Sequence, residues 1–194
     1  MKNLIKNFYI NSVIEDRKKI PFITLYLARI EKEKVIYELI EAFKLIKRNY
    51  NDVYLIIAGD GSQIKAINNI INNDDRIKMV GYVTGGIKTD IYKKSSIYVL
   101  PSYTECMPLS VLEAMAFGLP IICSEIGGLS DIIRDKENGI LVRCKDINSL
   151  YLAIENLYLN ISYINFNKAT YFYSKQVVSR LEAIYKKNIY NYSL

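Results

Sequence analysis

Two glutamates, Glu105 and Glu113, stand eight positions apart in the stretch of the chain with the most potential for chemistry. They lie between a Pro-Ser pair at 101–102 and a Gly-x-Pro sequence at 118–120. An apolar run precedes this segment and another follows it, which predicts a strand, a polar loop, a helix and a second strand. Ligands of open α/β sheets bind beyond the carboxyl ends of the strands, so both carboxylates are expected beside a binding crevice.

Basic residues follow the first predicted strand of the chain. Arg29 follows this strand, Lys34 comes five residues later, and Gly59-Asp60-Gly61 follows the second predicted strand. Arginine offers a bidentate fork for phosphate oxygens, and lysine adds a compact charge. The helix after Pro108 would direct free N–H groups and the positive end of its dipole at the same place. Together these groups suit a bound diphosphate.

The two glutamates suit the sugars on either side of such a diphosphate. We expect Glu113 to accept hydrogen bonds from the vicinal hydroxyls of a ribose, and Glu105 from hydroxyls of a transferred sugar. Hydrogen bonds to charged groups contribute about 1.5–3 kcal/mol each. If Arg29, Lys34 and the helix end neutralise the leaving diphosphate, no metal ion is required. Each feature alone also fits a solvated charge or a turn, although an unpaired charge at Glu113, among apolar neighbours, would be costly.

The composition excludes several classes of function. The chain has 194 residues, of which 51% are hydrophobic and 24% are charged, so it forms one sizeable globular domain or two small ones. It has no histidine, which excludes imidazole as a general base or metal ligand within the chain. Its three cysteines are widely spaced and fit neither a disulfide framework nor a zinc site, which indicates a reducing compartment.

The sequence has no clear targeting signal and no charge pattern typical of nucleic-acid binding. The first residues lack the apolar core of a signal peptide, and the longest apolar stretch, 108–123, is interrupted by Glu113 and so predicts no membrane span. The net charge is +6, but no dense cluster of basic residues with interleaved aromatics is present, so nucleic acid is not an expected partner. We expect a cytoplasmic protein, with peripheral contact at the inner membrane face left open.

Apolar runs alternate with helical patterns six times along the chain. The predicted strands are 22–27, 53–58, 77–80, 97–100, 120–123 and 139–142. The predicted helices are 35–47, 62–72, 89–94, 109–117, 127–133 and 146–159. This alternation predicts an α/β fold, a Rossmann-like parallel six-stranded sheet with helices on both faces. In such a sheet Arg29, Lys34, Glu105 and Glu113 would converge on one cleft at the switch point between the first and fourth strands.

These motifs, in this order, resemble the donor-binding C-terminal half of a family 4 retaining glycosyltransferase, an enzyme with the two-domain GT-B fold. The similarity runs from about 22 to about 159. The matching segments are Ala28-Arg29 with Lys34, 57–61, 80–83, 100–102, Glu105, 111–120, Gly127-Gly128 and 138–142. Ala28, Val35 and Cys106 depart from the pattern, because they stand at positions where the family usually or often has glycine.

The resemblance implies roles for individual residues. The implied catalytic residues are Glu105, near the transferred sugar, and Arg29 and Lys34, on the donor diphosphate. Glu113 is implied on the ribose, and Tyr82 and Val83 beside the base. The remaining implied donor-binding residues are Gly59, Gly61 and the loop Met107, Pro108, Leu109 and Ser110, whose backbone amides would meet phosphate and sugar. The implied reaction transfers a sugar from a UDP- or GDP-linked donor with retention, without a metal or cofactor.

The resemblance also implies a domain organisation. Residues 1–20 would be a remnant or linker of an N-terminal domain, 21–164 the nucleotide-sugar-binding domain, and 165–194 a helical tail crossing back. The acceptor, a saccharide or a lipid-linked molecule, would bind through the N-terminal domain, so the isolated chain is expected to be inactive. Exposed Tyr171, Phe172 and Tyr173 in the tail would favour self-association.

Other functions stay open on the sequence. One is a nucleotide-sugar binding module without transfer activity, or a remnant of a truncated enzyme. A phosphate-binding signalling domain would need clustered acidic residues after the first strand, where this chain has Arg29. A hexose epimerase with the same two-domain fold would need a histidine, and the chain has none.

Overall fold

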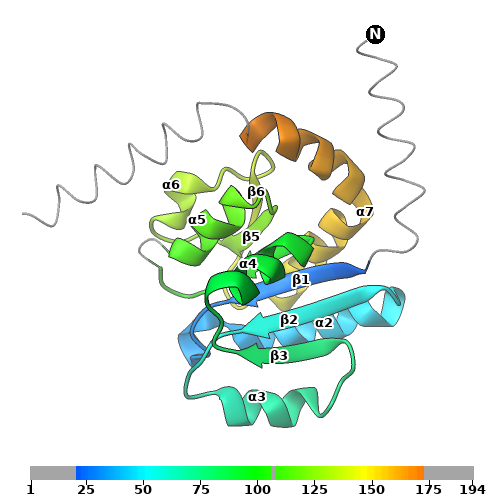
Figure 1. Ribbon diagram of the computed structural model, residues 1–194, viewed down its shortest axis with the longest axis vertical. Coiled ribbons are helices and arrows are strands. Elements are labelled where there is room, and N and C mark those ends of the chain that lie inside the picture. The colour runs from blue at the N-terminus through cyan, green and yellow to red at the C-terminus, as the bar shows by residue number, and fades with distance from the viewer. Residues whose placement is uncertain (1–20, 106–107, 173–194) are drawn as a thin grey trace, which may run out of the picture.

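The structure, a computed structural model, describes residues 21–105 and 108–172 (Figure 1). Its strands are β1 (Phe22–Leu27), β2 (Val53–Ala58), β3 (Ile77–Gly81), β4 (Ile97–Leu100), β5 (Ile121–Ser124) and β6 (Gly139–Val142). The helical elements are η2 (Lys32–Lys34), α2 (Ile36–Asn49), α3 (Ile64–Ile71), α4 (Gly85–Lys94), α5 (Leu109–Ala116), α6 (Leu129–Ile132) and α7 (Ile147–Phe172).

The strands form one parallel sheet in the order β3-β2-β1-β4-β5-β6. The order reverses between β1 and β4, which are hydrogen-bonded neighbours although their sequences are far apart. The predicted fold class is confirmed. The pattern of short, apolar strands explains why the chain forms such a sheet. All four residues of β4 and of β5 are buried, as expected when helices cover both faces of a sheet.

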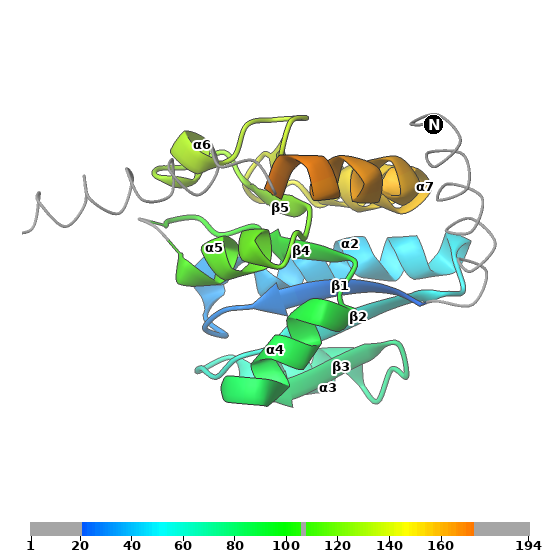
Figure 2. The same cartoon turned by 45° about the horizontal axis from the view of Figure 1, so that its top comes forward.

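Helices cover both faces of the sheet. Right-handed crossovers place α2 and α3 on one face and α4 and α5 on the other. Figure 2 shows α4 crossing the front of the sheet while α2 lies behind it. α7 returns to pack against α2. Since all strands are parallel, their carboxyl ends and the loops that follow them lie at a single edge.

Two predicted helices are clearly shorter than the observed ones. α4 begins at Gly85, four residues before the predicted start at Thr89, because Gly85-Gly86 enters the first turn instead of forming a loop. α7 continues to Phe172 instead of ending at Leu159, since no glycine or proline interrupts the sequence after 159. The predicted domain boundary at 164/165 therefore falls inside a continuous helix. Within the described residues, no helix is both long and apolar enough to span a bilayer.

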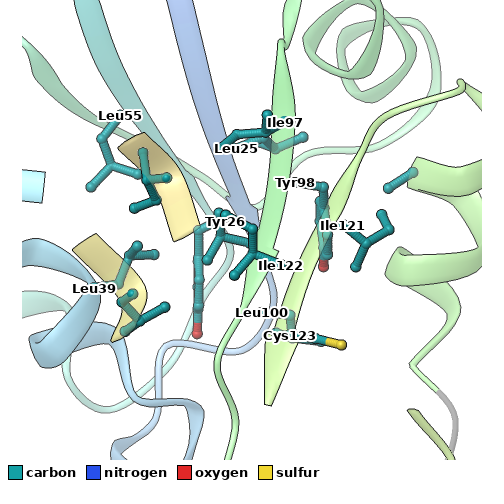
Figure 3. Packing of buried hydrophobic residues seen from close by; sticks show 14 of the residues in the cluster. Leu25, Tyr26, Leu39, Leu55, Ile97, Tyr98, Leu100, Ile121, Ile122 and Cys123 are labelled. Carbon is teal, nitrogen blue, oxygen red and sulfur yellow. The ribbon is translucent and has the colours of Figure 1, made fainter. Parts of the chain in front are cut away.

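Two tyrosines lie in the middle of the core, one on each face of the sheet. Tyr26 on β1 and Tyr98 on β4 are fully buried. Figure 3 shows Tyr26 on the side of Leu39 from α2, and Tyr98 on the side of Ile121 from β5. The Tyr26 hydroxyl donates to the carbonyl of Arg29 (3.0 Å), and the Tyr98 hydroxyl lies 2.9 Å from the carbonyl of Leu27. Both phenols therefore brace the end of β1, where the candidate site begins.

We expect these tyrosines to make the fold sensitive to alkaline pH. Burial raises the pKa of Tyr98 above its usual value near 10, so the phenol stays protonated in the folded state. The unfolded chain loses this proton first, and stability that is complete below about pH 10 is lost as the pH rises toward the folded-state pKa. The loss is about 1 kcal/mol between about pH 10 and 11 for one such tyrosine. Urea unfolding at both pH values should show a drop smaller by that amount in Tyr98→Phe, whereas identical drops would contradict this account.

Candidate functional site

A cavity of about 980 Å³ opens at the carboxyl edge of the sheet. Its walls come from the ends of β1, β2 and β3, the start of α4 and the start of α5. The lining residues are Leu27, Ala28, Arg29, Glu31, Gly59, Asp60, Gly61, Tyr82, Val83, Thr84, Gly85, Lys88, Leu109, Ser110 and Glu113. The cavity therefore lies beside the point where the strand order reverses, the usual place for a ligand in such a sheet.

Backbone contacts between neighbouring loops build the floor of the cavity. The N–H of Ile30 donates to the carbonyl of Asp60 (2.8 Å), and the N–H of Gly59 donates to the carbonyl of Gly81 (2.8 Å). A Cβ atom on Gly59 would lie 1.9 Å from the carbonyl oxygen of Ala28, and Gly59 has a φ of 145°. Glycine at this position is therefore required by the close approach of the loops after β1 and β2.

Glu31 ties the loop after β1 to the start of the loop before α3. Its carboxylate accepts hydrogen bonds from the Ser62 hydroxyl (2.5 Å) and the Ser62 backbone N–H (3.0 Å). These two hydrogen bonds lower the pKa of Glu31, which remains an exposed carboxylate at the cavity wall. The role of Glu31 could not be predicted from the sequence, since it depends on a partner thirty-one positions away.

Glu113 is held by two donors from α4. Its Oε1 accepts from Lys88 Nζ at 2.7 Å, and its Oε2 accepts from the Tyr92 hydroxyl at 2.9 Å. Tyr92 is buried, and that burial raises the pKa of its phenol well above the usual value, so the hydroxyl remains a donor. The charge predicted to be costly among apolar neighbours is thus paired, and its carboxylate faces the cavity.

Lys34 and Glu105 bind each other. Lys34 Nζ lies 2.6 Å from Glu105 Oε1, and each side chain is only 10% exposed. The Ser102 hydroxyl donates to the same oxygen at 2.7 Å. The loop before α5 is fixed to η2 as well, because the Tyr103 N–H donates to the carbonyl of Glu33 (2.8 Å). A buried ion pair with an added hydrogen bond therefore joins the first and fourth strand ends.

Tyr98 connects the end of β1 with the cavity. Its hydroxyl lies 2.7 Å from Ser110 Oγ, and Ser110 lines the cavity. Burial raises the pKa of Tyr98, and the charges of Glu105 and Glu113 raise it further. Of the two predicted glutamates, Glu113 lines the cavity and Glu105 does not.

Val35 adopts a backbone conformation that glycine favours. It has a φ of 58° and a ψ of 34°, it is fully buried, and it separates η2 from α2. A β-branched residue in this left-handed region carries strain. The resemblance places a glycine at this position, and the backbone here explains that preference. Lys34 is the last residue of η2, so the turn at Val35 follows it immediately.

The cavity brings together most of the predicted site residues. Those that line it are Arg29, Gly59, Gly61, Tyr82, Val83, Leu109, Ser110 and Glu113. Lys34, Glu105 and Pro108 are not among its lining residues. Met107 lies outside the described residues. The expected convergence of four charged side chains on one cleft is therefore seen for Arg29 and Glu113, while Lys34 and Glu105 face each other.

The lining residues absent from the predicted site are Leu27, Ala28, Glu31, Asp60, Thr84, Gly85 and Lys88. Lys88 is the most consequential of these, because it pairs with Glu113. The predicted helix began at Thr89, which left Lys88 outside it. The Lys88 and Tyr92 spacing of four is the signal that could have placed both on one face of α4. Among the described residues, no group of three or more acidic, cysteine or histidine side chains is arranged to hold a metal ion.

Comparisons with known proteins agree with this architecture. The sequence pattern of the family described as Glycosyl transferases group 1 matches residues 10–172. An uncharacterized glycosyltransferase of Methanocaldococcus jannaschii is 30% identical over 154 residues, which is 78% of this chain and 38% of the relative. The UDP-Gal:alpha-D-GlcNAc-diphosphoundecaprenol alpha-1,3-galactosyltransferase of Escherichia coli is 31% identical over 141 residues, 71% of this chain and 36% of the relative.

Solved structures show the same fold. The C-terminal domain of a glycosyl transferase group 1 family protein from Francisella tularensis superposes with a TM-score of 0.69 at 26% identity, over 85% of this chain and 89% of that domain. The six-stranded sheet is that of one Rossmann-like half of the GT-B fold. The chain spans 38% and 36% of the two curated relatives named above. From the extent of the matched pattern, the chain belongs to the group 1 glycosyl transferases.

Proposed function

We propose that this chain is the donor-binding half of a family 4 glycosyltransferase that uses a nucleotide-diphosphate sugar with retention and without a metal ion. The observation that carries the proposal is the cavity itself. Arg29, the start of α5 and Glu113 line one cavity at the carboxyl edge of a parallel sheet. The name of the E. coli relative gives UDP-linked galactose as its donor and a diphosphoundecaprenol-linked acceptor.

Each part of the donor has a matching part of the cavity. The diphosphate fits between Arg29 and the first N–H groups of α5, at Leu109 and Ser110, where the helix dipole favours an anion. The ribose fits against the Glu113 carboxylate. Tyr82, which is 77% exposed at the cavity wall, and Val83 fit beside the base. In this proposal a uracil or guanine base lies nearest β3.

Lys34 and Glu105 pair with each other and are not among the lining residues, and this proposal assigns them to the donor as well. The Lys34 ammonium has three N–H donors, so its bond to Glu105 leaves two for phosphate oxygens. Glu105 would accept from hydroxyls of the transferred sugar. Arg29, Lys34 and the start of α5 would then stabilise the charge that develops on the leaving diphosphate, and no cofactor is assigned. The acceptor, a saccharide or a lipid-linked molecule, would bind through an N-terminal domain, and the protein would act in the cytoplasm with peripheral contact at the inner membrane face.

Titration calorimetry with UDP, GDP and their hexose conjugates tests donor binding. We expect the wild-type chain to bind at least one of these ligands, and Glu113→Ala to weaken that binding about tenfold or more, because hydrogen bonds from the ribose to a carboxylate are lost. Glu125→Ala, at an exposed position outside the cavity, is the matched control and should bind as the wild type does. Absence of heat with every ligand, from folded protein, rules out a donor site. Binding without any transfer when an acceptor-binding partner is supplied favours the inactive binding module.

A further inference from the structure

Lys88 lines the cavity, but none of the proposed contacts with the donor involves it. Its side chain is 28% exposed, it lines the cavity, and its Nζ lies 2.7 Å from Glu113 Oε1. Resting on the proposed function, we propose that Lys88 is a positioning residue: it acts through Glu113, fixing that carboxylate in the orientation that recognises the ribose hydroxyls. Lys88 thereby sets the preference of the cavity for ribonucleotides over deoxyribonucleotides.

The two ends of the Glu113 carboxylate are held independently. Lys88 and Tyr92 stand four residues apart on α4, and therefore on one face of it, and each donates to a different oxygen of Glu113. Tyr92 is itself immobilised, because it is 1% exposed and its ring stacks on Phe117 with 5.1 Å between centroids and 10° between planes. If Tyr92 were the sole donor, the Glu113 carboxylate could still change its orientation, since the Glu113 side chain is 38% exposed. Lys88 removes that freedom.

The bond to Lys88 leaves Glu113 able to accept from a ligand. A carboxylate has about four lone-pair positions, and Lys88 and Tyr92 use one on each oxygen. The remaining positions suit two neighbouring hydroxyls. The direction in which these free positions point therefore depends on Lys88 together with Tyr92.

If Lys88 acts through Glu113, its replacement should weaken the binding of ribonucleotides more than that of deoxyribonucleotides. A purely structural role of Lys88 predicts no such difference. Lys88→Met keeps a long apolar side chain but removes the charge and the donors. We expect it to weaken UDP binding about tenfold and to weaken dUDP binding less than about threefold, because dUDP lacks the 2′-hydroxyl that the oriented carboxylate would accept from. Lys88→Arg, which keeps donors and charge, should recover most of the affinity for UDP.

Calorimetry on four proteins tests this: the wild type, Lys88→Met, Lys88→Arg and the control Lys93→Met, at an exposed position on α4. GDP and dGDP replace the uridine pair if the wild type prefers guanine. In a Glu113→Gln background, Lys88→Met should have little further effect on either nucleotide. Equal weakening of UDP and dUDP by Lys88→Met, or no weakening of UDP, overturns the role of Lys88. A wild type that binds neither UDP nor GDP refutes the proposed function instead.

Discussion

Replacement of Lys34 by methionine is expected to lower the free energy of unfolding by about 3–5 kcal/mol. The change would leave the Glu105 carboxylate, only 10% exposed, without its cation, and among the residues that the structure describes only the Ser102 hydroxyl would remain as its side-chain donor. Breaking a buried ion pair from one side is costly because the remaining charge stays out of water. A loss of this size is a large fraction of the roughly 5–15 kcal/mol that stabilises a typical domain. Urea denaturation followed by circular dichroism measures it.

The control for Lys34→Met is Lys32→Met, in the same short helix η2. Lys32 is exposed, so its replacement should change stability by less than about 0.5 kcal/mol. The double variant Lys34→Met/Glu105→Met should recover part of the lost stability, because both charges are then removed together. Equal stability of Lys34→Met and Lys32→Met would show that the ion pair does not hold the two strand ends together.

Gly59→Ala is the second change with a large expected effect, a loss of about 3–5 kcal/mol together with loss of nucleotide binding. The added Cβ would lie 1.9 Å from the backbone oxygen of Ala28, and neither backbone can move without opening the cavity floor. The same movement would break the hydrogen bond from the Gly59 N–H to the carbonyl of Gly81. Thermal unfolding and calorimetry with UDP should show both losses.

Gly86→Ala is the matched glycine substitution. A Cβ at Gly86 meets nothing within 4 Å, and the residue lies in the first turn of α4. Its replacement should leave stability within about 0.5 kcal/mol of the wild type. If Gly59→Ala and Gly86→Ala behaved alike, the loops after β1 and β2 would not pack as closely as described.

The sequence was sufficient to predict the sheet because each strand is a short apolar run bounded by polar residues or glycine. Parallel strands buried on both faces require that composition, so the alternation of six strands with helices could be recognised without further information. The short helix η2 could not, because it depends on the left-handed conformation of Val35, a residue type that rarely adopts it. The helix predicted at 146–159 and the start of the helical tail predicted from 165 belong to one continuous helix, α7, because no glycine or proline separates them.

The candidate site was predictable to the extent that it depends on strand ends. Arg29 and Glu113 follow from position alone, since loops at the carboxyl edge of a sheet lie near one another. The partners of these charges could not be predicted. Lys34 and Glu105 are separated by 71 positions and Lys88 and Glu113 by 25, and the choice among nearby charges depends on side-chain packing. The sequence therefore located the edge that carries the site, but not which carboxylate faces the cavity.

The most direct test of the central claim is an NMR titration of the labelled chain with UDP. The account predicts the largest shifts at the backbone amides of Gly59, Gly61, Leu109 and Ser110, which surround the cavity, and no shift at Val53, at the opposite end of β2. GDP is titrated in parallel to cover a guanine-specific site. Shifts confined to Val53 and its neighbours, or no shifts with either nucleotide, would contradict the claim that this cavity binds a nucleoside diphosphate.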